Sequence, residues 1–346
     1  MEMNLPSLQE IARQLVAPGT GILAADESEG TIAKRFAVIG LPVTFETRRD
    51  YREMLFRSHE AMSKYISGVI LTEETLKQSA LDGTPFVALL ADANSIPGIK
   101  VDRGAFEMPG TKGEKITEGL DGLRQRLAHY AEIGAKFAKW RGVIAISSYA
   151  PSRNGIRANA HVLARYAALC QEAGIVPVVE PEVLADGEPG DHGIERSAEV
   201  TGETLATVFE ELRLAGVDLT AMLLKPNMVT PGVRSPEKPT PELIARRTLD
   251  VLKAQVPASV PGIAFLSGGQ SDEAATANLS AMNRIGGAPW ALTFSYGRAL
   301  QTAALLAWNG DARNIEAAQA AFAHRARMNA LAAEGLWTPE QDRAAA

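Results

Sequence analysis

The sequence predicts an α/β fold, a (β/α)8 barrel of the TIM type formed as a single domain over residues 1–346. Eight short apolar runs alternate with segments of helical periodicity, and adjacent runs start about 30 to 45 residues apart, the spacing of βα units. The composition, 46% hydrophobic and 22% charged, is that of an ordinary globular chain. A doubly wound open sheet is the runner-up, but no G-x-G-x-x-G opens the first βα turn and no G-K-[ST] occurs.

The expected strands and helices follow one another along the whole chain. The apolar runs are Gly21–Ser28, Ser67–Glu74, Gly98–Asp102, Lys136–Arg141, Ile175–Glu182, Leu219–Asn227, Gly262–Gln270 and Trp290–Leu300. Helical periodicity predicts a lead-in helix over Ser7–Val16, an alanine-rich helix from Ala312 to about Gly335, and helices over Thr31–Phe36, Tyr51–Lys64, Thr75–Asp82, Pro85–Ala91, Glu118–Gly134, Asn159–Ala173, Gly202–Ala215, Pro241–Gln255 and Asp272–Arg284. The Gly/Pro-rich stretches Asp186–Gly193 and Pro231–Pro241 indicate surface loops.

Net charge and cysteine content limit the classes of binding partner and the cellular compartment that we expect for this protein. A net charge of −6 argues against nucleic acid and against an anionic membrane surface as partner. The first ten residues lack the basic and apolar regions of a secretory signal, and no apolar run approaches the length of a membrane span. The single cysteine, Cys170, fits a reducing compartment. We therefore expect a cytoplasmic protein that binds neither nucleic acid nor membranes.

The stretch LTAMLLKPNMVTP places one lysine, Lys225, at the end of an apolar run. Burying an ammonium without a partner is costly, so such a lysine either snorkels to water, has acidic partners, or is held partly neutral. A neutral lysine amine is a nucleophile that forms a Schiff base with a carbonyl. Lys225 taken alone does not decide between these possibilities.

Polar residues end the other expected strands as well, where a barrel carries its chemistry. Strand side chains alternate, so residues two apart share a face and can meet at the mouth of the barrel. Such a cluster would disfavour the ammonium form of Lys225 and supply a carboxylate to carry its proton. Each charge could instead be a solvated rim residue or a structural ion pair. The strand-end residues are Asp26, Glu73, Glu74, Lys100, Asp102, Lys139, Arg141, Glu180, Glu182, Lys225, Ser267 and Ser295.

Glycine turns after the last two runs indicate a phosphate site. SGGQ (Ser267–Gln270) and SYGRAL (Ser295–Leu300) place glycines where strands end, so that backbone N–H groups and a helix N-terminus can face an anion. Arg298 adds a fork of donors. Ser28, Thr31 and Arg35, together with Lys100, form a second candidate anion site. Two phosphate sites beside a lysine suggest a bisphosphorylated carbonyl substrate. The five scattered histidines form no zinc motif, so we expect neither a metal site nor a cofactor.

At these residues the sequence resembles class I fructose-bisphosphate aldolases. The matching motifs include GILAADES, GIKVD, FAKWR, IVPVVEPE, LLKPNMVTPG, FLSGGQ and PWALTFSYGRAL, in order from about Gly19 to about Trp337. The resemblance implies a barrel that forms a homotetramer and binds sugar phosphates. It also implies reversible, metal-independent cleavage of fructose 1,6-bisphosphate to dihydroxyacetone phosphate and glyceraldehyde 3-phosphate.

The resemblance also assigns roles to single residues. Lys225 matches the Schiff-base lysine, Asp26 the group acting at the C4 hydroxyl, and Glu180 the acid/base of carbinolamine formation and dehydration. Lys139 and Glu182 match residues that assist and orient within the same cluster. Residues matching one phosphate site are Ser267, Gly268, Gly297 and Arg298, with Ser295 beside them, and those matching the other are Ser28, Thr31, Arg35, Lys100 and Arg141.

The sequence departs from the family pattern in three places. Thr31 stands where serine is usual, the segment after Arg141 follows the family less closely, and the chain ends in EQDRAAA without the terminal tyrosine that assists proton exchange in relatives. We therefore expect slow proton exchange at C3 and weak cleavage turnover. Two rival interpretations are a different Schiff-base barrel, which would not need the second phosphate site, and a non-catalytic binding protein, which would not need Lys225, Glu180 or Asp26.

Overall fold

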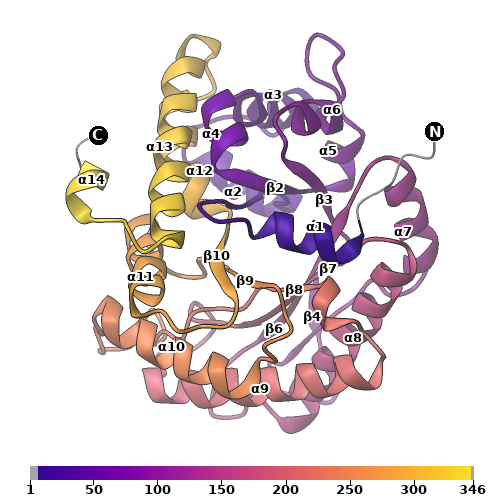
Figure 1. Ribbon diagram of the computed structural model, residues 1–346, viewed down its shortest axis with the longest axis vertical. Helices are drawn as coiled ribbons and strands as arrows, with labels where there is room; N and C mark the ends of the chain where they lie inside the picture. Colours follow the sequence, from indigo (N-terminus) through magenta and orange to yellow (C-terminus); the bar gives the residue numbers. More distant parts are fainter. Residues whose placement is uncertain (1–6, 344–346) are drawn as a thin grey trace.

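The computed structural model describes residues 7–343, and eight parallel strands in it close into a barrel in the order β1-β10-β9-β8-β7-β6-β3-β2 (Figure 1). This confirms the predicted fold. What we expect of residues 1–6 and 344–346, including the absent signal and terminal tyrosine, lies outside the described residues. The barrel strands are β1 (Gly21–Ala24), β2 (Ile66–Leu71), β3 (Ile96–Lys100), β6 (Phe137–Ile144), β7 (Val176–Val183), β8 (Leu223–Leu224), β9 (Gly262–Phe265) and β10 (Ala291–Tyr296).

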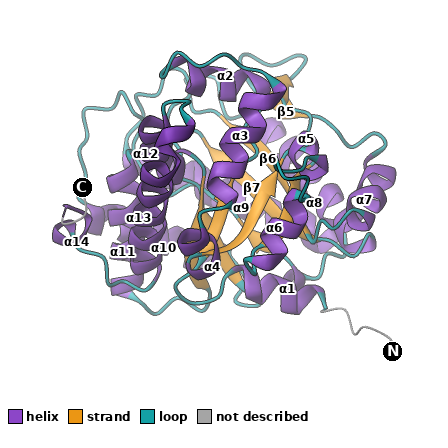
Figure 2. Cartoon of the chain, turned by 90° about the horizontal axis from the view of Figure 1, so that it is seen from above, coloured by secondary structure: helices purple, strands orange, loops and turns teal. Residues whose placement is uncertain are grey.

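Helices surround the barrel on its outer side, as the βα rhythm requires (Figure 2). A two-stranded antiparallel hairpin, β4 (Ala105–Glu107) with β5 (Lys115–Thr117), stands apart from the barrel sheet and has no counterpart among the predicted strands. The helices are α1 (Leu8–Leu15), α2 (Glu29–Ala37), α3 (Phe45–Phe56), α4 (His59–Lys64), α5 (Glu73–Lys77), α6 (Phe86–Asp92), α7 (Leu123–Glu132), α8 (Arg153–Glu172), α9 (Ile194–Leu214), α10 (Pro241–Gln255), α11 (Asp272–Ile285), α12 (Arg298–Trp308), α13 (Ile315–Ala333) and α14 (Pro339–Arg343), with 3-10 turns η1 (Leu219–Ala221) and η2 (Ala312–Asn314).

One predicted helix is divided in the structure, and another ends early. The helix predicted over Tyr51–Lys64 is two helices, α3 and α4, separated at Arg57 and Ser58. No glycine or proline marks this break, and both helices bury apolar residues, so the periodicity continues across it. The helix predicted over Thr75–Asp82 ends at Lys77, because Ser79 leaves the helix and forms a bridge with Pro85.

The long helices α8 and α9 begin earlier than their periodicity predicted, because carboxylates far away in the sequence cap their first turns. Glu114 accepts hydrogen bonds from the backbone N–H and hydroxyl of Ser152, the N-cap of α8, both at 2.7 Å. Glu237 accepts from the N–H of Ile194, the first residue of α9, at 2.8 Å. Such caps satisfy orphan donors of a first turn, but they come from 38 and 43 residues away in the sequence.

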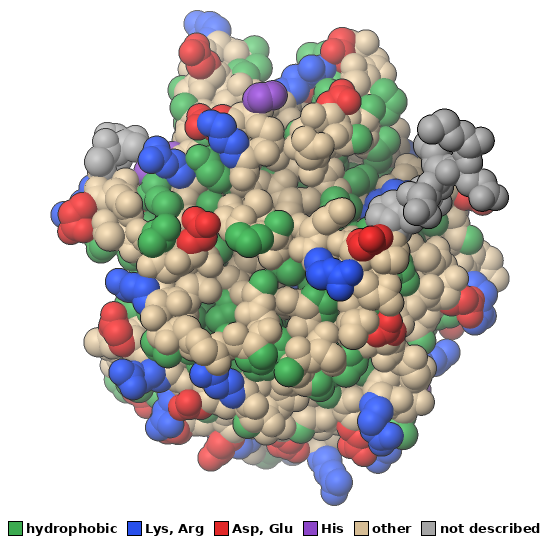
Figure 3. Space-filling view, in the orientation of Figure 1, with side chains coloured by type: hydrophobic (Ala, Val, Ile, Leu, Met, Phe, Trp, Pro, Cys, Tyr) green, Lys and Arg blue, Asp and Glu red, His purple; other side chains and the backbone are tan. Residues whose placement is uncertain are grey.

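Helix α1 closes the amino-terminal end of the barrel. Its Ile11 and Leu15 belong to a buried cluster with side chains from inside the barrel, among them Phe137 of β6. The Ser67 hydroxyl of β2 donates to the carbonyl of Leu15 at 2.7 Å, which ties the helix to the strands. Figure 3 shows this closed face, where hydrophobic side chains reach the surface near the middle and most charged ones lie nearer the periphery. The open end of the barrel is therefore the carboxyl end of its strands.

Glycine permits the close packing inside the barrel at Gly98 of β3. A Cβ atom there would lie 2.3 Å from the ring of Phe137, so no other residue fits without moving that ring. A second, larger core lies between the strands and the surrounding helices. Among residues 7–343, no helix combines the length and the apolar character needed to cross a membrane.

Candidate active site

A cavity of about 660 Å³ opens at the carboxyl ends of the strands. Glycine turns, two helix N-termini and most of the barrel strands contribute to its wall. The fifteen residues to which the sequence analysis assigns a catalytic or phosphate-binding role all line it: Asp26, Ser28, Thr31, Arg35, Lys100, Lys139, Arg141, Glu180, Glu182, Lys225, Ser267, Gly268, Ser295, Gly297 and Arg298.

Lys225 lies directly after β8, the shortest strand of the barrel, and only 3% of its surface is exposed. Its backbone N–H donates to the carbonyl of Val179 on β7 at 2.8 Å, which extends the strand pairing and turns the side chain into the cavity. Its Nζ lies 3.1 Å from Oε1 of Glu180. The lysine therefore has a buried acidic partner and does not snorkel to water.

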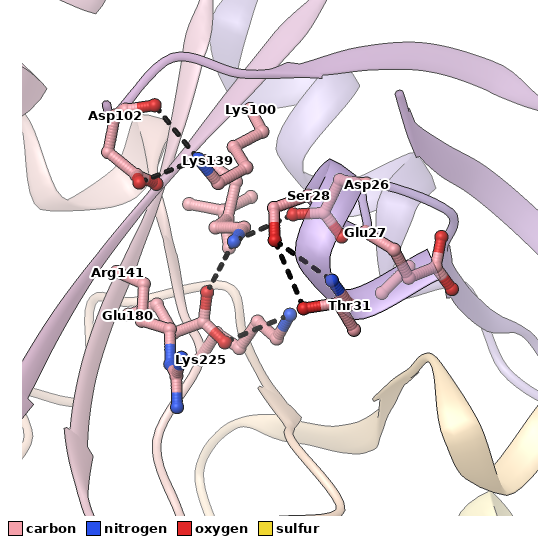
Figure 4. A network of polar contacts seen from close by, with 12 residues as sticks. Asp26, Glu27, Ser28, Thr31, Lys100, Asp102, Lys139, Arg141, Glu180 and Lys225 are labelled. Carbon is pink, nitrogen blue, oxygen red and sulfur yellow. Dashed lines mark hydrogen bonds and ion pairs between the residues drawn. The ribbon is translucent and has the colours of Figure 1, made fainter. Parts of the chain in front are cut away.

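Four charged side chains form one chain of ion pairs across the cavity floor, in the order Asp26, Lys139, Glu180, Lys225 (Figure 4). Nζ of Lys139 lies 2.8 Å from Asp26 and 3.2 Å from Oε2 of Glu180. Cations and carboxylates alternate, and Lys139, Glu180 and Lys225 are each at most 4% exposed. Alternation compensates the charges that burial would otherwise penalise.

The ion-pair chain holds Asp26, Lys139 and Glu180 in their charged forms. Burial by itself raises the pKa of Asp26, but the charges of Lys139 and Lys225 outweigh burial and hold that pKa well below its usual range. The same balance of burial against Lys139 and Lys225 lowers the pKa of Glu180. Burial lowers the pKa of Lys139, and Asp26 with Glu180 raises it far above the ordinary value. Both carboxylates are therefore ionised at neutral pH and can accept protons.

Two further pairs line the cavity wall. Arg141 of β6 pairs with Glu182 of β7, and the charge of that carboxylate raises the pKa of the guanidinium despite its burial. Nζ of Lys100 lies 2.7 Å from Oδ1 of Asp102 and donates to the backbone carbonyl of the same residue at 2.8 Å. Lys100 is thereby fixed at the rim of the cavity, with its ammonium still partly exposed.

Two clusters of donors and cations lie where anions would bind. Ser28 caps α2, and its Oγ lies 3.1 Å from Oγ1 of Thr31. Arg298 is the first residue of α12, directly after Gly297, so its guanidinium and a helix N-terminus face the same part of the cavity. Helix N-termini and arginine forks both favour phosphate oxygens.

Gly268, in the turn after β9, packs closely against two side chains. A Cβ there would lie 2.6 Å from Cδ1 of Leu266 and 3.0 Å from Oε1 of Glu182. The backbone at this turn therefore packs directly against the carboxylate that pairs with Arg141.

The structure corrects one part of the expected strand-end cluster. Glu73 and Glu74 do not reach the cavity, because β2 ends at Leu71 and both residues start α5. Glu74 pairs with Arg48 at 2.6 Å, and Glu73 pairs with Lys77 at 2.7 Å.

Sequence reasoning also missed residues that support the site. Glu27 is buried between Arg35 and Arg52 and pairs with both, which orients Arg35 along the cavity wall. The amide of Gln301 donates to the carbonyl of Ala24, at the end of β1, at 2.7 Å. The only sequence feature that could have indicated Glu27 was its position next to Asp26. No sequence feature indicated Gln301, which lies within the helix α12. Within residues 7–343, no group of three or more His, Cys, Asp or Glu side chains is arranged to hold a metal ion.

A buried lysine paired with a carboxylate, at the carboxyl end of a barrel and beside anion-binding groups, defines a carbon–carbon lyase of the lysine-dependent type. The family model for class I fructose-bisphosphate aldolase matches residues 7–346. The chain is 52% identical over 336 residues to a probable class 1 fructose-bisphosphate aldolase of Xanthomonas campestris, covering 97% of this chain and 99% of the relative. It is 53% identical to human fructose-bisphosphate aldolase C over 331 residues, covering 95% and 90% of the two chains.

A solved structure agrees with these matches. Fructose-bisphosphate aldolase of Plasmodium falciparum, determined in complex with TRAP and a small-molecule inhibitor, superposes with a TM-score of 0.92 at 47% identity, covering 97% of this chain and 98% of that one. The chain belongs to the class I fructose-bisphosphate aldolase family and is therefore a lyase.

Proposed function

We propose that Lys225 is the lysine that forms the Schiff base with the ketose carbonyl. The observation that carries this proposal is the position of its Nζ, buried in the cavity and 3.1 Å from Glu180. Attack of the amine on C2 gives a carbinolamine, and loss of water from it gives a protonated imine. Glu180 accepts the ammonium proton before attack and returns a proton to the leaving hydroxyl. The other paired lysines of the cavity are Lys100, which Asp102 holds, and Lys139, which lies between Asp26 and Glu180.

Asp26 is the base of the cleavage step in this proposal. The iminium carbon accepts the electron pair of the C3–C4 bond as that bond breaks, so an enamine forms rather than a free carbanion. The C4 hydroxyl loses its proton to Asp26 and becomes the aldehyde of glyceraldehyde 3-phosphate. A proton added at C3 and water added at C2 then release dihydroxyacetone phosphate and restore Lys225. The carboxylate of Asp26 is ionised at neutral pH, which is the form that can accept a proton.

Lys139 and Glu182 orient the reacting groups. Lys139 holds Asp26 and Glu180 at fixed positions on either side of its ammonium. Glu182 fixes Arg141, which leaves the guanidinium facing the cavity. Restricting these groups to one geometry lowers the entropy cost of reaching the transition state.

The two anion-binding clusters hold the two phosphates of the substrate. Ser267, Gly268, Ser295, Gly297 and Arg298 bind one phosphate, and Ser28, Thr31, Arg35, Lys100 and Arg141 bind the other or balance its charge. Fixing both ends of the sugar chain places C2 at Lys225 and C4 at Asp26. A second phosphate site also favours a bisphosphorylated ketose over a smaller sugar phosphate.

We also propose that the protein is a homotetramer of the cytoplasm. The family resemblance supports the assembly, and the single buried cysteine supports a reducing compartment. Sedimentation equilibrium tests the assembly directly, since the chain mass is 36.9 kDa. A mass of about one or two chains would contradict a tetramer.

Borohydride trapping tests the role of Lys225. Reduction in the presence of dihydroxyacetone phosphate should attach the three-carbon label to Lys225, and peptide mapping should find it there. The Lys225→Met variant should lose both labelling and cleavage, while Lys253→Met, which removes an exposed lysine of α10, should keep both. A label on any other lysine, or cleavage by Lys225→Met, would show that the assignment is wrong.

A further inference from the structure

The turn that follows β9 is held from behind by two amide side chains. The carbonyl of Ser267 accepts two hydrogen bonds from Gln270, one from its backbone N–H at 3.1 Å and one from its side-chain Nε2 at 2.9 Å. Gly269, inside this turn, has φ +68°, a backbone conformation that glycine adopts without strain. Gln270 therefore fixes where the Ser267 carbonyl points, and with it the orientation of the peptide groups of the turn.

A second amide fixes the orientation of the first. Asn278 of α11 is 3% exposed, and its Nδ2 donates to Oε1 of Gln270 at 2.6 Å. A backbone carbonyl only accepts hydrogen bonds, so the nitrogen of the Gln270 amide must face Ser267 and its oxygen must face Asn278. A flip of the Gln270 amide would lose both contacts, and a flip of the Asn278 amide would lose the contact between the two amides. The three residues form a directional relay, from Asn278 through Gln270 to Ser267.

The relay lies behind the turn and not in the substrate cavity. Ser267 and Gly268 line the large cavity, whereas Gln270 and Asn278 line a separate cavity of about 290 Å³ on the other side of the turn. Among the residues that the structure describes, no acceptor is assigned to the backbone N–H groups of Ser267 and Gly268. These two donors are therefore free to bind an anion in the large cavity, provided that the turn keeps its shape.

We propose that Gln270 and Asn278 are positioning residues that set the preference of the enzyme for a phosphorylated carbonyl substrate. This inference rests on the proposed function, in which Ser267 and Gly268 bind a substrate phosphate. The two amides do not touch the substrate. They act through the carbonyl of Ser267, whose direction decides whether the N–H groups of the turn converge on the phosphate.

Imine trapping with two ketones that differ only in the phosphate measures this preference. The concentration for half-maximal borohydride trapping is determined for dihydroxyacetone and for dihydroxyacetone phosphate. The first concentration divided by the second is the ratio that reports the contribution of the phosphate. The Gln270→Met variant keeps the length of the side chain and removes the two hydrogen bonds of its amide, to Ser267 and from Asn278, while the backbone N–H of residue 270 can still donate to Ser267. It should lower the ratio about fivefold, the factor that one neutral hydrogen bond typically contributes to an equilibrium.

Two further variants test whether the amides act as one unit. Asn278→Leu, and the double variant with Gln270→Met, should lower the ratio by the same fivefold factor, because Asn278 acts on the Ser267 carbonyl only through the amide of Gln270. The matched control is Gln319→Met, which removes a half-buried glutamine whose Nε2 donates to the carbonyl of Met54 at 3.0 Å, away from the cavity. The control should leave the ratio unchanged.

The possible outcomes separate this inference from the proposed function. Arg298→Ala removes a proposed phosphate ligand and should also lower the ratio. If Arg298→Ala lowers the ratio and Gln270→Met does not, the relay has no positioning role and only the inference fails. If neither lowers it, this turn does not bind the phosphate, and both the inference and the phosphate assignment fail. A general loss of folding weakens trapping of both ketones equally and leaves the ratio unchanged, and that result counts against the relay. Effects of the two substitutions that multiply in the double variant would also count against it.

Discussion

Lys139→Met should leave the carboxylate of Asp26 without its ion-pair partner, while Glu180 keeps its contact with Lys225. In the native protein Lys139 contacts both Asp26 and Glu180, at 2.8 and 3.2 Å, and is 4% exposed. Removing one partner of a buried ion pair destabilises a protein by about 3–5 kcal/mol. With an unfolding entropy of about 2.1 cal/mol/K per residue, 346 residues convert that loss into a fall of roughly 4–7 °C in Tm at neutral pH.

The loss should depend on pH in a direction that the geometry fixes. The pKa of Asp26 is depressed in the folded protein, so its ion pairing contributes stability above the unfolded pKa, near 3.8, and that contribution is lost as pH falls through the folded pKa. Without Lys139, burial again dominates and raises the folded pKa of Asp26 above its unfolded value. The variant then loses stability as pH rises, so the difference in Tm from the native protein should be larger at pH 8 than at pH 5.

Thermal unfolding by circular dichroism at fixed protein concentration measures this difference. The control is Lys77→Met, which breaks an exposed pair of similar length with Glu73 at 2.7 Å and should leave Tm nearly unchanged, because exposed ion pairs contribute little to stability. A difference between Lys139→Met and the native protein that is the same at pH 5 and pH 8 would refute the argument, because the lost stability would then not come from buried carboxylates.

Three further predictions follow from the site. Asp26→Asn should still form the imine but lose about 10²- to 10⁴-fold in the rate of fructose 1,6-bisphosphate cleavage. Borohydride trapping should therefore persist while aldehyde release falls, and equal losses in both assays would contradict a role limited to C4. Glu180→Gln should slow borohydride trapping by a similar factor, whereas the control Glu118→Gln, at an exposed position, should not. Unimpaired trapping in Glu180→Gln would show that Glu180 takes no part in imine formation. Dialysis against EDTA should leave cleavage unchanged, and activity lost to EDTA and restored by a divalent cation would contradict a metal-independent mechanism.

The barrel and its active end could be predicted because both depend on local patterns. Apolar runs at βα spacing predicted the strands, and the period of two along a strand correctly grouped Lys139 with Arg141 and Glu180 with Glu182 on one side. Lys225 was conspicuous because an ammonium at the end of an apolar run needs an explanation. The family motifs then implied its role before any contact was known.

The errors arose where local pattern and tertiary contact compete. Glu73 and Glu74 follow an apolar run as Asp26 does, but Thr72 caps a helix there by accepting from the N–H of Thr75 at 3.2 Å, so their side chains turn outward to Arg48 and Lys77. The caps that Glu114 and Glu237 supply to α8 and α9 come from loops far along the chain. No window of the sequence contains both partners of such a contact.

The sequence by itself determined which chemical groups reach the open end of the barrel and in what order along the chain. Lys225, one cation at the end of one strand, was therefore visible as a candidate nucleophile. Only the tertiary structure decided which charges meet. Asp26 follows β1, whose neighbours are β2 and β10, yet it pairs with Lys139 of β6 across the barrel. Pairing across the interior depends on barrel closure, strand register and side-chain length together, and these are properties of the folded chain as a whole.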